Sequence, residues 1–225
     1  MPDPIAMLGR QLDADLLRLQ AVSQNVANAN TAGYRAARLA VAQGDAPATL
    51  RSDLRTAGAL DPTGGALDVA IIGAAFFAVA TPDGERYTRA GDLKRLADGT
   101  LATATGQAVL GVDGPIQIPD APVTIDATGT VSHAGAKLAQ LKLVTLPDVT
   151  RAHLAGPGLF AYDGEVGDGS GARVVQGVLE RSNVDVTDEM VRMMETSRHA
   201  ESVQRAIGAY EQMMATALQE LGRNR

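Results

Sequence analysis

The 225-residue chain lacks cysteine and tryptophan, and aromatic residues make up only 3% of it. Without cysteine the chain has no disulfide, no thiolate metal site and no thiol nucleophile. The chain also lacks an excess of basic charge, because 20 Lys and Arg against 26 Asp and Glu give a formal net charge of −6. Binding of nucleic acid or docking on anionic lipid needs a basic face. We therefore expect neither partner.

A membrane-spanning segment is missing as well. The longest apolar stretch, Val69 to Ala80, is well short of the roughly 20 residues that cross a bilayer. The N-terminus opens Met1-Pro2-Asp3-Pro4 and has no basic region ahead of an apolar one. We therefore expect no direct membrane span and no cleaved secretory signal peptide.

No catalytic or ligand-binding constellation is recognisable in the sequence. The Gly167–Ala172 loop has the spacing of a dinucleotide-binding loop, but Arg173–Val175 continues as a strand where that fold needs a helix. The acidic residues of the same loop do not match calcium-loop spacing. His133, His153 and His199 have no neighbouring ligand at metal-binding spacing. We expect no catalytic residues, no enzyme activity, no cofactor and no metal.

Helical patterns occur at both ends of the chain. From Ile5 to Val26 apolar residues recur at steps of three and four, as in a helix with a narrow apolar seam. The Asn- and Gly-containing stretch Asn28–Gly33 favours the end of this helix. A second helix is predicted to begin at Thr187 as its N-cap and to continue to about Leu221.

Short apolar runs separated by turn signals fill the middle of the chain. Asp-Gly and Thr-Gly pairs supply the positive φ angles of tight hairpins, and they occur at Gly84, Gly99, Gly106, Gly114, Gly129 and Gly164. Such frequent turns favour antiparallel strands. Strands are predicted at 67–72, 76–80, 86–89, 123–125, 140–146 and 173–179.

These patterns predict an α+β fold in which long N- and C-terminal helices pair as a coiled-coil-like layer, with a central antiparallel β-rich domain. The predicted domains are a terminal helical (coiled-coil) domain at 1–34 plus 183–225, an extended connector at 35–66, and the β-rich domain at 67–182.

Each predicted helix carries too narrow an apolar stripe to be stable alone. Burial of seven side chains contributes about 10–15 kcal/mol, whereas ordering each residue costs roughly 1–2 kcal/mol of backbone entropy. Two alternatives follow: a helical hairpin that shares one core with the β domain, or packing against other subunits. The charged residues Arg10, Asp13, Asp15 and Arg18 form either a solvated helix face or a contact that sets register between helices. The residues predicted to contact other subunits are Ile5, Leu8, Leu12, Leu16, Leu19, Val22, Val26, Met190, Met194, Val203, Ile207, Tyr210, Met214 and Leu221.

Three further stretches carry a distinctive order of residues. The first, Ser23–Tyr34, has an Asn-rich helix end followed by Thr, Gly and an aromatic residue. The second is Leu67–Phe77, which continues with Tyr87–Gly91 after a Pro-Asp-Gly turn, and the third is Gly177–Asp185. In this order, they resemble the bacterial flagellar rod and hook axial protein family. The matching residues are Asn25, Asn28, Thr31, Gly33, Tyr34, Asp68, Gly73, Phe76, Phe77, Glu180, Ser182, Asn183 and Val184.

The resemblance implies a structural, non-enzymatic subunit of the flagellar basal-body rod, assembled helically into the torque-transmitting drive shaft. It implies partners among the same and paralogous axial proteins, and the flagellar type III export apparatus during secretion. It also implies a periplasm-spanning location in the basal body, reached without a cleaved signal peptide. The Leu110–Ile116 stretch and the modest 35–66 connector are most similar to the F-type proximal-rod branch. The alternatives are a distal-rod or other axial subunit, and a cytosolic β-domain binding module dimerised through its helices.

Overall fold

The computed structural model describes residues 4–40 and 48–223. The described residues fall into two compact units, which are treated separately below. The helical unit lies within residues 1–26, 37–50 and 185–225, and the β unit comprises residues 27–36 and 51–184. Among the described helices, none is long and apolar enough to cross a membrane.

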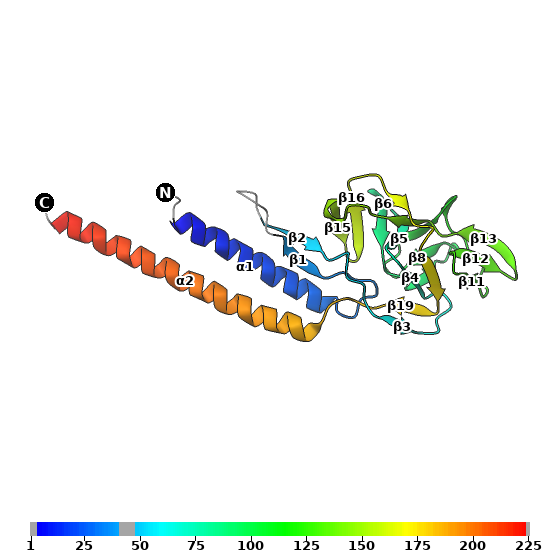
Figure 1. The fold of residues 1–225 in the computed structure, drawn as a ribbon, viewed down its shortest axis with the longest axis horizontal. Helices are drawn as coiled ribbons and strands as arrows, with labels where there is room; N and C mark the ends of the chain where they lie inside the picture. Colours follow the sequence, from blue (N-terminus) through cyan, green and yellow to red (C-terminus); the bar gives the residue numbers. More distant parts are fainter. Residues whose placement is uncertain (1–3, 41–47, 224–225) are drawn as a thin grey trace. The chain divides into compact units, whose positions relative to one another are not determined.

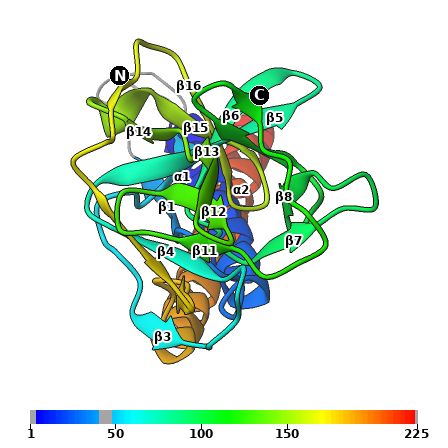
Figure 2. The ribbon, with the colours of Figure 1, turned by 90° about the vertical axis from the view of Figure 1, so that its right-hand side faces the viewer.

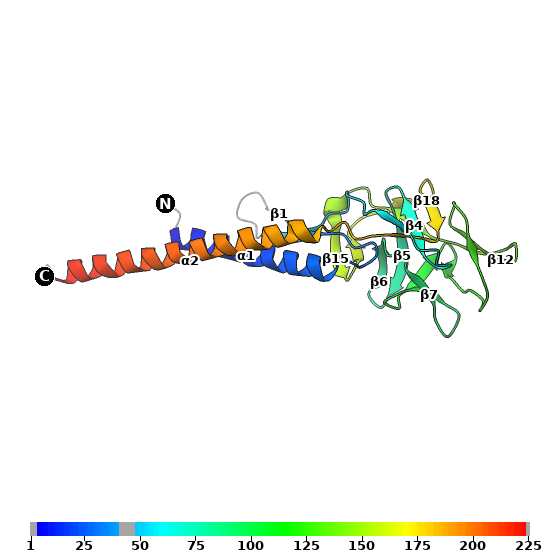
Figure 3. The ribbon, with the colours of Figure 1, turned by 90° about the horizontal axis from the view of Figure 1, so that it is seen from below.

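Two α-helices dominate the described part of the helical unit: α1 (Pro4–Ala27) and α2 (Val186–Arg223). They run antiparallel, with α1 beside the N-terminal part of α2 (Figures 1 and 3). Helix α2 begins two residues earlier than a Thr187 N-cap would place it. The Asp185 carboxylate accepts hydrogen bonds from the backbone N–H groups of Thr187 and Asp188, at 2.8 and 3.3 Å, and so occupies the N-cap position.

The predicted fold class is wrong in its pairing of terminal helices as a coiled-coil-like layer. Polar side chains form part of the contact between α1 and α2, where Asp15 contacts His199 and Asn25 contacts Glu189. The apolar residues Val22 of α1 and Val203 of α2 are buried as well. Leu16, from the predicted seam, is 56% exposed, and the other exposed members are Ile5, Val26, Met190, Met194 and Met214. An apolar stripe of period 3.5 shows that a helix has one apolar face, but not which element covers that face. Here, hydrogen-bonded polar pairs form part of the contact between the two helices.

Nineteen short strands are found among the described residues, most of them in the β unit. Two precede the β-rich core and pair with each other: β1 (Ala37–Ala40) and β2 (Thr49–Ser52). The next nine are β3 (Leu60–Pro62), β4 (Val69–Ile72), β5 (Ala75–Thr81), β6 (Gly84–Thr88), β7 (Leu93–Arg95), β8 (Leu101–Thr103), β9 (Ala108–Gly111), β10 (Gly114–Pro115) and β11 (Thr124–Ile125). The remainder are β12 (Thr130–His133), β13 (Ala136–Gln140), β14 (Leu143–Thr145), β15 (Ala152–Gly156), β16 (Leu159–Tyr162), β17 (Gly167–Asp168), β18 (Arg173–Gln176) and β19 (Val178–Glu180), with a 3₁₀ helix at Val149–Arg151 before β15.

The largest sheet of the β unit has ten strands and is built on β5 (Figure 2). Its main path runs β15-β16-β6-β5-β9-β8-β7, and each pairing given for it is antiparallel. Strand β5 alternates between two cores. Phe77 and Val79 pack in the larger core, whereas Phe76 and Ala78 pack in a second core with Phe160. A central strand buried on both faces explains the near-continuous apolar run in the sequence.

Glycines at the predicted hairpin turns adopt positive φ angles at five of the six positions. Those five are Gly84, Gly99, Gly106, Gly114 and Gly129, whereas Gly164 is not among the positive-φ glycines. The strand predicted at 173–179 is divided into β18 and β19, because Gly177 adopts φ +76° between them. Glycine reaches this left-handed conformation without the steric penalty that other residues incur.

Candidate functional site

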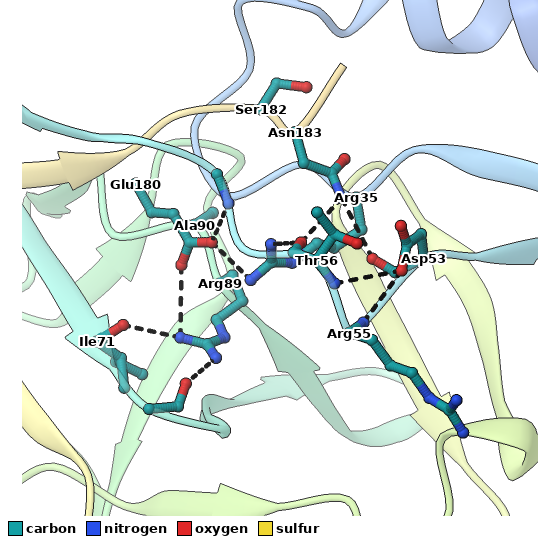
Figure 4. Close-up of polar contacts among 12 residues, drawn as sticks. Arg35, Asp53, Arg55, Thr56, Ile71, Arg89, Ala90, Glu180, Ser182 and Asn183 are labelled. Carbon is teal, nitrogen blue, oxygen red and sulfur yellow. Dashed lines mark hydrogen bonds and ion pairs between the residues drawn. The ribbon is translucent and has the colours of Figure 1, made fainter. Parts of the chain in front are cut away.

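A buried ionic cluster joins distant segments of the β unit. The Glu180 carboxylate, at the end of β19, lies between the guanidinium groups of Arg35 and Arg89 (Figure 4). Its oxygens are 2.5 Å from the nearest Arg35 nitrogen and 3.4 Å from the nearest Arg89 nitrogen. The same carboxylate accepts a hydrogen bond from the Gly58 backbone at 3.0 Å. We call these three charged residues the Glu180 cluster.

The arginines of the Glu180 cluster also bind backbone carbonyls. Arg89 donates to Ile71 at 2.9 Å and to Gly73, and its guanidinium lies 5.0 Å from the centre of the Phe76 ring, within the range of a cation–π contact. Arg35 donates to the carbonyl of Thr56. The cluster therefore fastens the segment before β3, the end of β4 with the residue after it, and the end of β19 to one another.

The Glu180 cluster has a further acidic neighbour, because the Asp53 carboxylate also attracts Arg35. Two guanidinium groups meet one carboxylate, and the exposed fractions are 1% for Arg35, 4% for Arg89 and 2% for Glu180. Burial lowers the pKa of both arginines, to about 10 for Arg89, because loss of solvation outweighs the attraction of Glu180. Among the described residues, the Nε atoms of both arginines have no hydrogen-bond partner.

Asn183 ties the ends of the motif stretches together in the β unit. Its side-chain oxygen accepts from the Ala36 backbone at 2.7 Å, and its side-chain nitrogen donates to the Thr56 carbonyl at 2.9 Å. Gly33 donates to the backbone oxygen of Glu180 at 2.7 Å and adopts φ +64°. A Cβ at Gly33 would lie 2.2 Å from the backbone carbon of Arg89. Only glycine permits this approach.

A second buried polar cluster lies in the helical unit. Asn25 of α1 pairs with the backbone of Ala37 through both its side-chain atoms, at 2.7 and 3.0 Å. It also donates to the Glu189 carboxylate of α2 at 3.0 Å. Glu189 is fully buried and forms an ion pair with Arg38 at 2.6 Å. One amide thus holds α1, the start of β1 and the first turn of α2 together.

The charged residues predicted on α1 are not simply a solvated face. Asp15 is 1% exposed, and its two oxygens lie 2.5 Å from Arg18 and from the His199 Nδ1. Gln11 contacts the other nitrogen of His199 at 3.3 Å. Asp15 and His199 therefore set the register between α1 and α2 inside one chain.

The residues predicted to contact other subunits lie in different environments. Val22 and Val203 are buried within the chain, whereas Leu8, Leu12, Leu19, Ile207 and Tyr210 are half-buried. The side chain of Leu221 lies outside the described part of the structure. The exposed members are Ile5, Leu16, Val26, Met190, Met194 and Met214. The interaction role of this set remains a prediction.

Most family-motif residues are buried or form hydrogen bonds within the chain. Tyr34, Phe76 and Phe77 are buried. Asn28 accepts from Thr31 at the end of α1, and Asp68 accepts from Thr63. Ser182 accepts from the Val184 backbone at 3.2 Å, while Gly73 is a carbonyl acceptor for Arg89.

Sequence reasoning missed the charged partners Arg35, Arg38, Arg89 and His199, and it left open whether Asp15 is solvated or paired. Charges usually lie on the surface, so one charged residue in a sequence gives no signal that it is buried and paired. The positions of Arg35 and Arg89 directly after motif residues Tyr34 and Thr88 were the available hint.

The loop at Gly167–Ala172 has no dinucleotide-binding geometry. Its first two residues form β17, and strand β18, not a helix, follows it. The fingerprint requires a helix N-terminus at that place. Within residues 4–40 and 48–223, no three His, Cys, Asp or Glu side chains are grouped so as to hold a metal ion.

Comparison with known proteins places these motif stretches in a family. Residues 70–133 match the family model "Flagellar hook protein FlgE/F/G D1 domain", and residues 175–220 match "Flagellar basal body rod FlgEFG protein C-terminal". The chain is 31% identical to the flagellar basal-body rod protein FlgF of Caulobacter vibrioides, with 91% of this chain and 92% of that protein covered. It is 34% identical to FlgF of Escherichia coli, with 91% and 93% covered. It is also 28% identical to the flagellar basal-body rod protein FlgG of Agrobacterium fabrum, with 96% and 98% covered.

In the sequence, two terminal helices flank the β unit, in which the motif residues Tyr34, Phe76 and Phe77 are buried. The chain belongs to the family of flagellar basal-body rod proteins.

Proposed function

We propose that this chain is a structural subunit of the flagellar basal-body rod that occupies the F-type position in the proximal part of the drive shaft. The observation that carries the proposal is its similarity to FlgF proteins along nine tenths of the chain. FlgG relatives match at lower identity, 28%, which supports the F-type position over the distal one.

The exposed apolar side chains of the terminal helices support an assembling role. Leu16 and Met194 are 56% and 55% exposed, and they belong to a set that also includes Ile5, Met7, Met190, Met193, Met213 and Met214. Large apolar surfaces left open on one chain are typical of interaction sites, and methionine adapts to irregular partners. We propose that other axial subunits cover these side chains in the rod.

The proposal includes partners and location. The partners are the same and paralogous axial proteins, together with the export apparatus during secretion. The location is the periplasm-spanning rod of the basal body, reached without a cleaved signal peptide. The role is mechanical and non-enzymatic, since helices packed between subunits resist sliding under torque.

The test is incorporation into purified hook–basal bodies, measured by quantitative mass spectrometry, together with swimming. Leu16→Asp is expected to abolish incorporation, because it puts a charge on the proposed contact. The isolated variant is expected to unfold at the same urea concentration as wild type, since Leu16 is exposed within the chain. Ser202→Asp adds the same charge at an exposed position of α2 that has no member of the proposed contact set three or four residues away, and it is expected to incorporate normally.

Normal incorporation of Leu16→Asp would contradict the contact assignment. Absence of the wild-type chain from basal bodies would contradict the proposed function itself. A stable dimer in dilute solution that never enters basal bodies would instead favour a cytosolic binding module.

A further inference from the structure

A cavity of about 350 Å³ opens beside the Glu180 cluster, within the β unit. Its floor is buried and includes Arg35, Arg89 and the ring of Phe76, while Leu54 and Leu146 add apolar walls. Its remaining lining residues are Arg55, Ala57, Gly73, Ala74 and Val149, the first four of which are exposed and form its rim. The volume lies at the lower end of the range for small-ligand sites and suits a side chain better than a large cofactor.

The charged residues that line this cavity are all positive. Its described lining residues include three arginines, Arg35, Arg55 and Arg89, and no acidic residue. Glu180, which pairs with two of them, does not line the cavity. Arginine carries five N–H donors and stays protonated at neutral pH, so each guanidinium has more donors than one shared carboxylate accepts. The carbonyls of Thr56, Ile71 and Gly73 also accept from these two arginines, and only their buried Nε groups have no described partner.

Two buried arginines share the Glu180 carboxylate, and the Asp53 carboxylate also attracts Arg35, so the surplus positive charge beside the cavity is that of one arginine. An incoming carboxylate gains from this imbalance, because Arg–carboxylate pairs form strong charge-assisted hydrogen bonds. The apolar walls fit the methylene groups that carry a carboxylate in Asp and Glu. The rim arginine, Arg55, adds attraction for an approaching anion.

We propose that this cavity is a carboxylate-binding site that receives an Asp or Glu side chain of an adjoining axial subunit. The inference rests on the proposed function for the source of the carboxylate. Axial subunits of this acidic kind can supply such a group, since this chain itself has 26 acidic residues against 20 basic ones. The cavity thereby adds a specific ionic contact of the β unit to the contacts of the helices.

Charge reversal at the rim is the first test. Arg55→Glu places a carboxylate at the cavity mouth, and we expect about a tenfold or greater loss of incorporation into basal bodies. The fold is expected to survive, because the rim side chain is exposed. The matched control, Lys137→Glu, makes the same charge change on the exposed β12–β13 hairpin, which does not line the cavity. Equal urea midpoints for the three isolated chains establish that folding is unchanged.

Cross-linking is the second test and uses the absence of cysteine. Ala74→Cys adds one thiol to the chain, on the cavity rim, and Ala136→Cys adds one on the exposed hairpin as a control. Basal bodies with either chain are treated with a reagent that has a maleimide at one end and a hydrazide for carbodiimide-activated carboxylates at the other. We expect mass spectrometry to find the Ala74→Cys thiol joined to an Asp or Glu of another chain.

The outcomes separate this proposal from the proposed function. If the wild-type chain is present in basal bodies, but Arg55→Glu incorporates like Lys137→Glu and no cross-link to a carboxylate of another chain forms, the cavity proposal is overturned and the rod function stands. Stabilisation of the isolated chain by sodium acetate beyond sodium chloride, without that cross-link, would assign the site to free anions and also overturn the subunit source.

Discussion

Replacement of Glu180 by glutamine tests whether buried charge holds the segments of the β unit together. The change keeps the size of the side chain but removes its negative charge, leaving Arg35 and Arg89 without their shared carboxylate. One of the two oxygens becomes an NH₂ group, so a donor faces a guanidinium that also only donates. The hydrogen bond from Gly58, at 3.0 Å, is weakened as well if that oxygen is the one replaced.

The expected loss is large because the cluster is almost fully buried. Removal of one partner from a buried ion pair costs about 3–5 kcal/mol, since the remaining charge cannot be solvated. With a urea dependence of about 2 kcal/mol per molar, this loss lowers the unfolding midpoint by roughly 1.5–2.5 M. Glu85→Gln provides the matched control. Glu85 pairs with Lys142 at 2.6 Å, but both side chains are about one-third exposed, so we expect a loss of at most about 1 kcal/mol.

Urea unfolding can be followed by far-UV circular dichroism and by tyrosine fluorescence. The chain has no tryptophan to mask its four tyrosines, and Tyr34, next to Arg35, is buried. A double variant, Glu180→Gln with Arg89→Gln, removes one of the stranded positive charges. We expect it to be less destabilised than the sum of the two single changes, because the residues are directly coupled.

The reasoning would be refuted by a Glu180→Gln midpoint that matches that of Glu85→Gln. A double variant whose loss equals the sum of the single losses would show that shape, not charge, accounts for the effect.

Two further predictions concern other positions of the chain. Gly33→Ala is expected to destabilise the protein by about 3 kcal/mol or more, because Gly33 has φ +64° and its new Cβ would lie 2.2 Å from the backbone of Arg89. The control is Gly208→Ala, which has open space around it in α2 and is expected to stabilise the protein by up to about 1 kcal/mol. Equal urea midpoints for the two variants would contradict the argument that Gly33 is needed for close approach. Hydrogen bonds from Thr128 and Thr130 lower the pKa of Asp126 to about 2, below its unfolded value of about 4, so its stabilisation is present above pH 4 and is lost as the pH falls toward 2. When the pH is lowered from about 6 to about 2.5, the unfolding free energy of Asp126→Asn should therefore fall by less than that of wild type. The control variant Asp113→Asn, at the exposed β9–β10 hairpin tip, should show the wild-type fall. A wild-type fall in Asp126→Asn would contradict the stabilising role of the Asp126 carboxylate.

Local signals in the sequence were sufficient where short-range chemistry decides the conformation. The Asn28–Gly33 stretch ends α1, since its short polar side chains and glycine favour turns over helix. Several predicted strands lie within two residues of observed ones, as at β5 and β6. The predicted start of α2 was wrong by two residues, because Asp185, two residues before Thr187, forms the N-cap instead.

The periodicity of the helices could not predict what faces them. Steps of three and four define an apolar stripe on α1. Asp15 lies within that stripe, three residues after Leu12 and four before Leu19, and Asn25 lies at its edge, three residues after Val22. Those two side chains found hydrogen-bond partners on α2 and became buried, while Leu16 stayed exposed in the chain. Which face is covered depends on partners far away in the sequence, and a period contains no information about them.

The amino-acid sequence by itself determined that a helix lies at each end of the chain, the bounds of strands such as β5 and β6 to within two residues, the positive-φ glycines at five hairpin turns, and the family motifs. These features depend on backbone sterics and on neighbours a few residues away. Only the tertiary structure decided that Arg35, Arg89 and Glu180 meet and that a cavity lined by three arginines opens beside this Glu180 cluster. It also decided that Asp15 and His199 join the two helices. The physical reason is that burial and pairing of charge arise from contacts between residues as many as 184 positions apart. Such contacts exist only after the chain has folded.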